Sequence, residues 1–175
     1  MRIGQIGIAL AAITLANCAG DQAGRALAAR GSATATLADA NGKIVGTATA
    51  TSVKEGLRVT MSASQLSQGQ HGVHIHAVGQ CDAPGFMTAG GHWNPTGAKH
   101  GAHNPAGPHE GDLPNMIVGK DGRGSLGVVI PGGTIEGLLD ADGATLVIHA
   151  AADDLVTDPS GNSGARVACG VFGRN

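Results

Sequence analysis

The sequence predicts an all-β domain, a Greek-key antiparallel β-sandwich or flattened barrel of about eight strands with two long functional loops. Segments that alternate small and β-branched residues, bounded by glycine-rich turns, are typical of antiparallel strands. The chain of 175 residues contains 30 glycines, one Trp, two Phe and no Tyr. A core of small aliphatic side chains suits packed sheets better than a helical bundle. We therefore expect no helix and no internal repeat.

Turn signals separate the predicted strands along the chain. The dipeptides Asn41-Gly42, Asp121-Gly122 and Asp142-Gly143 favour tight turns between apolar segments. The predicted strands cover residues 32–38, 43–53, 56–63, 72–78, 117–118, 125–130, 135–139, 144–150 and 166–172.

Two long stretches interrupt this pattern. Residues 81–116 are rich in proline and glycine and hold four of the eight histidines together with Asp112. A loop of this length in a compact domain is usually functional or disordered, and the clustered histidines favour a loop that a metal ion orders. Residues 153–165 form the second predicted loop.

The first 30 residues predict a signal peptide and linker ahead of a domain that spans residues 31–175. Arg2 precedes an apolar stretch at residues 3–15, which is too short to span a membrane comfortably but fits a secretory signal. Leu15-Ala16-Asn17-Cys18 also resembles a bacterial lipoprotein signal, in which a lipidated Cys18 would anchor the protein to a membrane. The alternative is simple cleavage between residues 18 and 29. Both alternatives predict an extracytoplasmic, periplasmic location.

Two cysteines remain in the predicted mature domain. Disulfides persist in oxidising compartments, so we expect Cys81 and Cys169 to form one. The alternative is two free buried thiols. The formal net charge of −2 and the lack of a basic run argue against nucleic acid as a partner.

The histidines predict two groups of metal ligands. His74 and His76 are two apart on a predicted strand and therefore project to the same side, where His149 could supply a third nitrogen. Such a set of imidazoles suits Cu(II). A second group offers three nitrogens and one carboxylate, which suits zinc, and consists of His92, His100, His109 and Asp112.

Alternatives exist for these histidines. A lone His-x-His is a weak signal, and a histidine-rich loop can be a loose metal-scavenging tract. We leave His71 and His103 out of the site, since His71 fits a hydrogen-bonding strand residue and His103 a solvated loop residue.

Several motifs resemble those of the copper,zinc superoxide dismutases, in the family's order and spacing, from about residue 31 to the C-terminus. They are Gly72-Val73-His74-Ile75-His76, Gly90-Gly91-His92-Trp93-Asn94-Pro95, Lys99-His100-Gly101, residues 107–114 and residues 164–171. The resemblance implies an enzyme that converts superoxide to oxygen and hydrogen peroxide with copper and zinc as cofactors.

The resemblance also implies roles for individual residues. Copper would be held by His74, His76, His92 and His149, and zinc by His92, His100, His109 and Asp112. His92 would then bridge the two metals and carry a proton to peroxide. Arg166 would attract superoxide, and Asp153 would link copper and zinc ligands through hydrogen bonds.

Two departures from the family pattern affect other expectations. The loop after Cys81 has its own composition, so the resemblance implies a homodimer but leaves a monomer open. The loop after His149 lacks a Glu- and Lys-rich stretch that could steer superoxide, a task left to Lys54, Lys99 or Lys120.

The rival functions are a non-catalytic exported copper or zinc carrier on the same fold and a structural β-sandwich. Neither rival needs Arg166 or a shared imidazole.

Overall fold

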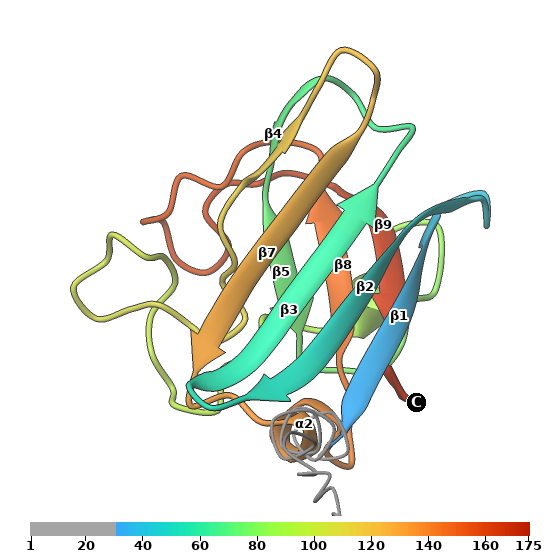
Figure 1. The fold of residues 1–175 in the computed structure, drawn as a ribbon. Helices are drawn as coiled ribbons and strands as arrows, with labels where there is room; N and C mark the ends of the chain where they lie inside the picture. Colours follow the sequence, from blue (N-terminus) through green and yellow to red (C-terminus); the bar gives the residue numbers. More distant parts are fainter. Residues whose placement is uncertain (1–30) are drawn as a thin grey trace, which may run out of the picture.

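The computed structural model describes residues 31–175 as a nearly closed antiparallel β-barrel (Figure 1). Within these residues the sheet has ten strands in the order β4-β6-β7-β3-β2-β1-β9-β8-β5, with β10 paired to β1. The strands are β1 (Ser32–Asp39), β2 (Ile44–Val53), β3 (Gly56–Ala63), β4 (Gly69–His71), β5 (Val73–His76), β6 (Met116–Val118), β7 (Gly124–Pro131), β8 (Thr145–His149), β9 (Arg166–Val171) and β10 (Gly173–Arg174). The predicted all-β class is confirmed. The predicted signal segment and Cys18 lie outside the described residues.

The core lies inside the barrel and consists mainly of aliphatic side chains. On β1, β2 and β3 the buried and exposed positions alternate, as expected for strands with one face toward solvent. Alanines such as Ala35 and Ala50 fill the interior of β1 and β2, while Leu57, Ile75 and Leu146 are fully buried. By contrast, every residue of β5 and β8 is buried, because the long loops cover their outer face.

The prediction of a strand at residues 135–139 is wrong, and so is the expectation of no helix. Residues Ile135–Leu138 form the short helix α2, and Met87–Ala89 form the 3-10 turn η1. Thr134 caps α2, because its side-chain oxygen accepts a hydrogen bond from the Gly137 N–H at 2.9 Å. Ile135 and Leu138, three residues apart, both point into the core.

The predicted strand at residues 72–78 is interrupted at Gly72, which separates β4 from β5. The Gly72 N–H donates to the Ala151 carbonyl, and its carbonyl accepts from His149 N–H. A Cβ atom at this position would lie 2.9 Å from Cβ of Ser163. Glycine therefore allows the second loop to pass close to the start of β5, where the predicted site begins.

The two long loops lie side by side on one flank of the barrel (Figure 1). Lys99 and Asp158 form an ion pair at 2.9 Å, and the His103 N–H donates to the Leu155 carbonyl at 2.9 Å. The loops thus form one layer over β5 and β8.

The predicted disulfide between Cys81 and Cys169 is confirmed, with a Cα–Cα distance of 5.7 Å. It ties the first loop to β9 across 88 positions of sequence. In the chain-entropy model, closing a loop of that length stabilises the fold by about 4–5 kcal/mol. Between residues 31 and 175, no helix has the length and apolar character needed to cross a membrane.

Candidate metal centre

The candidate metal ligands converge where β5 and β8 meet the loop layer. His74 and His76 lie on β5, and His149 ends the neighbouring strand β8. An isolated β-bridge pairs His76 with His92 and so brings the first loop against β5. In both predicted groups, the ligand atoms lie within 4.8 Å of one another.

The first group presents four ring nitrogens that are buried and lack a hydrogen-bond partner. They are Nδ1 of His74 and Nε2 of His76, His92 and His149. An unpartnered buried polar atom costs free energy, so four in one place call for a shared ligand. Four nitrogen donors at this spacing fit a copper ion.

In three of these histidines the opposite ring nitrogen is hydrogen-bonded, which fixes the tautomer. His74 Nε2 donates to Asp153 Oδ2 at 2.6 Å and His76 Nδ1 donates to the Gly90 carbonyl at 2.9 Å. His149 Nδ1 donates to the Gly164 carbonyl at 3.1 Å. Because these nitrogens carry the protons, the unpartnered nitrogens present lone pairs, as a metal requires.

The second group surrounds one oxygen of Asp112. Its Oδ1 lies 2.7 Å from His92 Nδ1 and 3.1 Å from Nδ1 of both His100 and His109, and the last lies 3.4 Å from His92 Nδ1. Donors about 2.0–2.2 Å from a tetrahedral zinc ion lie about 3.3–3.6 Å apart. The observed spacings approach this range, so three nitrogens and a carboxylate oxygen fit zinc.

His92 belongs to both groups through different ring atoms. Its Nδ1 faces Asp112, while its Nε2 faces the first group without a partner. A single imidazole can therefore contact an ion on each side. This arrangement requires the loss of both ring protons, which two nearby cations favour.

The pKa values of three of these histidines lie well below neutrality, so their imidazoles are neutral near pH 7. Burial lowers the pKa of His76 to about 2 and that of His92 to about 4, although the hydrogen bond with Asp112 acts in the opposite direction on His92. Burial and then the charge of His74 lower the pKa of His149 to about 4. Neutral imidazoles can bind a cation without first releasing a proton to solvent.

The carboxylate of Asp112 is ionised and held by the backbone. Burial raises its pKa, but the hydrogen bond with His92 and the N–H of Gly101 outweigh burial and hold the pKa well below its usual range. Its Oδ2 accepts from the N–H groups of Gly101 and His109 at 2.9 and 3.0 Å. These bonds orient Oδ1 toward the histidine nitrogens.

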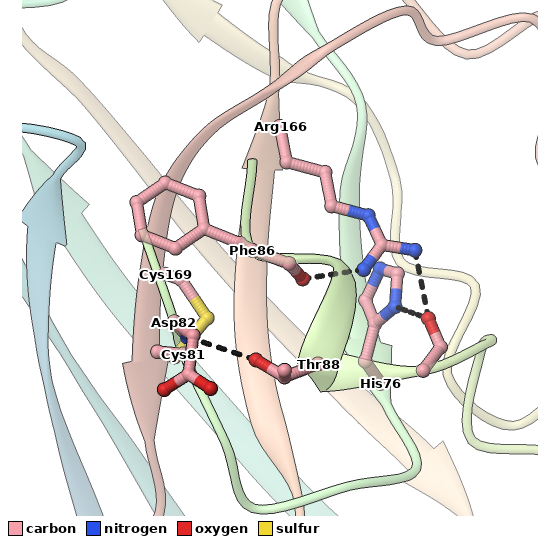
Figure 2. Close-up of a disulfide and its surroundings, with 8 residues drawn as sticks. His76, Cys81, Asp82, Phe86, Thr88, Arg166 and Cys169 are labelled. Atoms are coloured by element: carbon pink, nitrogen blue, oxygen red, sulfur yellow. Dashed lines mark hydrogen bonds between the residues drawn. A yellow bond between two sulfur atoms is a disulfide. The ribbon is translucent and has the colours of Figure 1, made fainter. Parts of the chain in front are cut away.

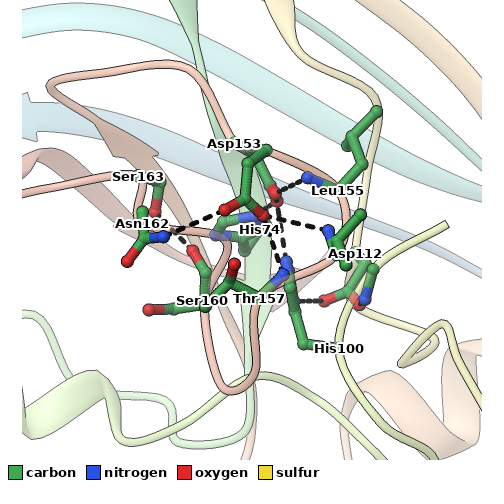
Figure 3. A network of polar contacts seen from close by, with 12 residues as sticks. His74, His100, Asp112, Asp153, Leu155, Thr157, Ser160, Asn162 and Ser163 are labelled. Atoms are coloured by element: carbon green, nitrogen blue, oxygen red, sulfur yellow. Dashed lines mark hydrogen bonds and ion pairs between the residues drawn. The ribbon is translucent and has the colours of Figure 1, made fainter. Parts of the chain in front are cut away.

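Asp153 links the two groups, because its carboxylate contacts one histidine of each (Figure 3). Oδ2 accepts from His74 Nε2 at 2.6 Å, and Oδ1 lies 3.1 Å from His100 Nε2. Burial raises the pKa of Asp153, but the hydrogen bonds with His74 and His100 outweigh burial and lower the pKa to about 2. The ionised carboxylate thus fixes one histidine of each group.

Arg166 lies beside the first group, on the wall of a cavity of about 690 Å³ that reaches His76, His92 and His149. Its guanidinium donates to the carbonyls of Phe86 and Gly90 at 2.7 Å each (Figure 2). The Gly90 carbonyl also accepts from His76, so one carbonyl positions both side chains. Burial lowers the pKa of Arg166, yet a guanidinium stays charged near neutrality.

The disulfide helps to hold this arrangement. Figure 2 shows Cys81, Cys169, Phe86 and Arg166 close together. Cys169 lies on β9 with Arg166, while Cys81 anchors the loop segment that supplies the Phe86 carbonyl. The acceptors of the guanidinium are therefore attached to the strand that carries it.

The remaining candidates fall outside the two groups. His71 is buried on β4 and its Nδ1 lies 2.6 Å from the His149 carbonyl, so it supports a neighbour of the site. His103 is an exposed loop residue. Lys99 pairs with Asp158, and neither Lys54 nor Lys120 lines the cavity, whose only Lys or Arg among residues 31–175 is Arg166.

Sequence reasoning missed residues that act through the backbone. Asn115 makes two side-chain hydrogen bonds to the backbone of Asp153. Asp158 accepts from the His100 N–H at 2.9 Å as well as from Lys99. Asn115 and Asp158 lie outside the motifs that predict metal ligands, and only the meeting of two distant loops reveals their contacts.

This barrel and its site define a class of protein: a β-barrel protein with two adjoining groups of candidate metal ligands that share one histidine. The family model described as copper/zinc superoxide dismutase (SODC) matches residues 40–172. The chain belongs to this family. It is an oxidoreductase of the superoxide dismutase type whose cofactors are copper and zinc.

Individual relatives agree with this assignment. A superoxide dismutase [Cu-Zn] of Deinococcus radiodurans is 44% identical over 153 residues, which cover 79% of this chain and 82% of that protein. The superoxide dismutase-like protein YojM of Bacillus subtilis is 44% identical over 124 residues, and the match spans 67% of this chain and 63% of that relative. The crystal structure of Cu/Zn superoxide dismutase from Brucella abortus has a TM-score of 0.66 and 32% identity, covering 80% of this chain and 98% of the other.

Proposed function

We propose that this chain converts superoxide to oxygen and hydrogen peroxide at a copper–zinc centre that shares His92. In this proposal the first group, called the copper-side group, binds copper and consists of His74, His76, His92 and His149. The second group, called the zinc-side group, binds zinc and consists of His92, His100, His109 and Asp112. The observation that carries the proposal is the two-sided environment of His92. Its Nδ1 faces the zinc-side carboxylate, while its Nε2 is buried among three other unpartnered nitrogens. When bound, copper supplies one-electron exchange with superoxide and zinc supplies a fixed cation at Nδ1 of His92.

His92 is the proposed proton carrier. His92 lines the cavity, and its unpartnered Nε2 is the atom that would hold a proton for release to peroxide formed there. The contacts of its Nδ1 on the zinc side keep the ring in place during that transfer.

Arg166 is the proposed binding group for the superoxide anion. Hydrogen bonds to two carbonyls fix its guanidinium on the cavity wall. Since no other Lys or Arg of the described chain lines this cavity, Arg166 supplies the attraction that draws an anion inward.

We further propose that the domain works outside the cytoplasm, in the periplasm, after export by the signal segment at residues 1–30. The disulfide between Cys81 and Cys169 supports an oxidising compartment. Cys18 is the candidate lipid-attachment residue for a membrane anchor, and a homodimer is the expected assembly. Mass spectrometry of the exported protein tests lipidation, and light scattering distinguishes a dimer from a monomer.

The decisive experiment measures superoxide removal by the purified protein loaded with one copper and one zinc per chain. We expect dismutation that disappears when copper is removed and returns when it is restored. A protein that binds both metals tightly but does not accelerate dismutation would instead be an exported metal carrier.

A further inference from the structure

Asn115 occupies the point where the first loop enters β6, three residues after Asp112. The side chain is half-buried, and its Nδ2 donates to the Asp153 carbonyl at 2.8 Å. Its Oδ1 accepts from the Asp153 N–H, also at 2.8 Å. An amide that pairs with both polar groups of one residue fixes that backbone unit in position and orientation, as a neighbouring strand would.

The carboxylate of Asp153 has little freedom to compensate for a backbone shift. Oδ1 is shared between His100 Nε2 at 3.1 Å and the Leu155 N–H at 2.6 Å, while Oδ2 accepts from His74. On another side the backbone of Gly161 is so close that a Cβ there would collide with Oδ1. A displaced Asp153 would therefore lose bonds to one histidine of each metal group.

We propose that Asn115 is a positioning residue that sets the copper-side and zinc-side histidines through Asp153. The inference rests on the proposed copper–zinc function. No hydrogen bond joins Asn115 to a proposed metal ligand in the described chain; its side-chain bonds go to Asp153 alone. Because Asn115 follows Asp112 closely, it also ties the segment of the zinc-side carboxylate to the carboxylate that connects the two groups.

The chain offers a matched control for this role. Asn104 also joins the first loop to the second, since its Nδ2 donates to the Val156 carbonyl at 3.4 Å. Its Oδ1 accepts from the Ala106 N–H within its own loop, and among the described residues no hydrogen bond joins it to Asp153. Asn104→Ala therefore removes an anchor between loops without releasing the carboxylate.

The test compares zinc transfer to a chelator and the Cu(II) electron paramagnetic resonance spectrum in metal-loaded variants. Asn115→Ala should release zinc about tenfold faster. This is the lower end of the roughly 10–100-fold loss in metal affinity or activity that follows replacement of a residue that orients a metal ligand. Its Cu(II) spectrum should also change, because His74 loses a fixed acceptor. Asn115→Asp keeps the shape and the acceptor for the Asp153 N–H but sets a carboxylate oxygen against the Asp153 carbonyl, so it should also release zinc faster than the parent. It serves as the test if Asn115→Ala does not fold. Asn104→Ala should retain the parent rate and spectrum.

A double-mutant cycle separates positioning from simple loop anchoring. In an Asp153→Ala background, Asn115→Ala should change zinc release less than twofold, since the carboxylate that transmits the effect is gone. A full tenfold effect in that background, or parent behaviour of both Asn115 variants, would overturn the inference. If the parent protein binds no zinc, the proposed function itself fails. Parent binding of both metals with unchanged Asn115 variants would refute only the positioning role.

Discussion

The copper-side and zinc-side groups differ in what holds their side chains. His74, His76 and His149 lie on β5 and β8, where strand pairing sets their positions. His100 and His109 lie in a loop without regular secondary structure, held by hydrogen bonds with Asp112 and Asp158. The strands of the barrel therefore position three of the four copper-side histidines, whereas hydrogen bonds within the loop layer position the zinc-side ligands.

The largest expected effect comes from His149→Ala. This change removes a nitrogen that belongs to the copper-side group alone, so dismutase activity should fall at least about a hundredfold. Zinc content should stay at the parent level. A superoxide assay with metal analysis checks both, and the exposed His103→Ala provides the control with parent activity. His74→Ala is a less specific test, because His74 is bonded to Asp153.

Asp112→Ala should break the other side of the comparison. It removes the anionic ligand and the acceptor for the Gly101 and His109 N–H groups, so zinc affinity should fall by about a hundredfold. Zinc competition and thermal melting measure the change, and we expect a lower Tm. Glu110→Ala, a neighbouring carboxylate outside both groups, should leave zinc affinity unchanged. Parent zinc stoichiometry in Asp112→Ala would mean that another residue completes the group.

Arg166→Gln should change the rate without changing either metal group. Loss of the cavity's guanidinium should lower kcat/KM for superoxide by about tenfold at low salt, and added salt should slow the parent more than the variant. Lys99→Gln is the matched control, since Lys99 is already paired with Asp158. An Arg166→Gln variant with the parent rate at low ionic strength would remove the guiding role.

Acid should destabilise the metal-free protein. The pKa values of His92 and His149 are lowered from 6.5 to about 4, so the unfolded chain binds protons first as pH falls. Their contribution to stability is therefore complete above pH 6.5 and lost between pH 6.5 and 4. Allowing for relaxation of the loops, we expect a loss of about 1–2 kcal/mol from pH 7 to pH 5. Urea unfolding at both pH values tests this expectation, and equal stabilities would contradict it.

The barrel and the shared direction of His74 and His76 were predictable from sequence because each rests on local periodicity. Alternation along a strand places His74 and His76 on the same side, and turn dipeptides bound most strands. The strand predicted at residues 135–139 was wrong because a Thr134 cap redirects the chain into a helical turn. That signal is short, and the apolar residues around it fit either structure.

Apart from Asp153, the supports of the site could not be predicted, because they depend on contacts between distant loops. The bonds of Asn115 to Asp153 join residues 38 apart, and Arg166 donates to carbonyls 80 and 76 positions away. Backbone carbonyls have no residue type that sequence could reveal. The pairing of Lys99 with Asp158 likewise becomes visible only once both loops lie together.

The most direct test of the central claim is native mass spectrometry of the parent protein and His149→Ala, each loaded with both metals. The account predicts one copper and one zinc per parent chain, bound together, and one zinc without stably bound copper in His149→Ala. Loss of zinc along with copper in His149→Ala, or a parent chain that never holds both ions at once, would contradict the claim that a barrel-held copper group and a loop-held zinc group meet at His92.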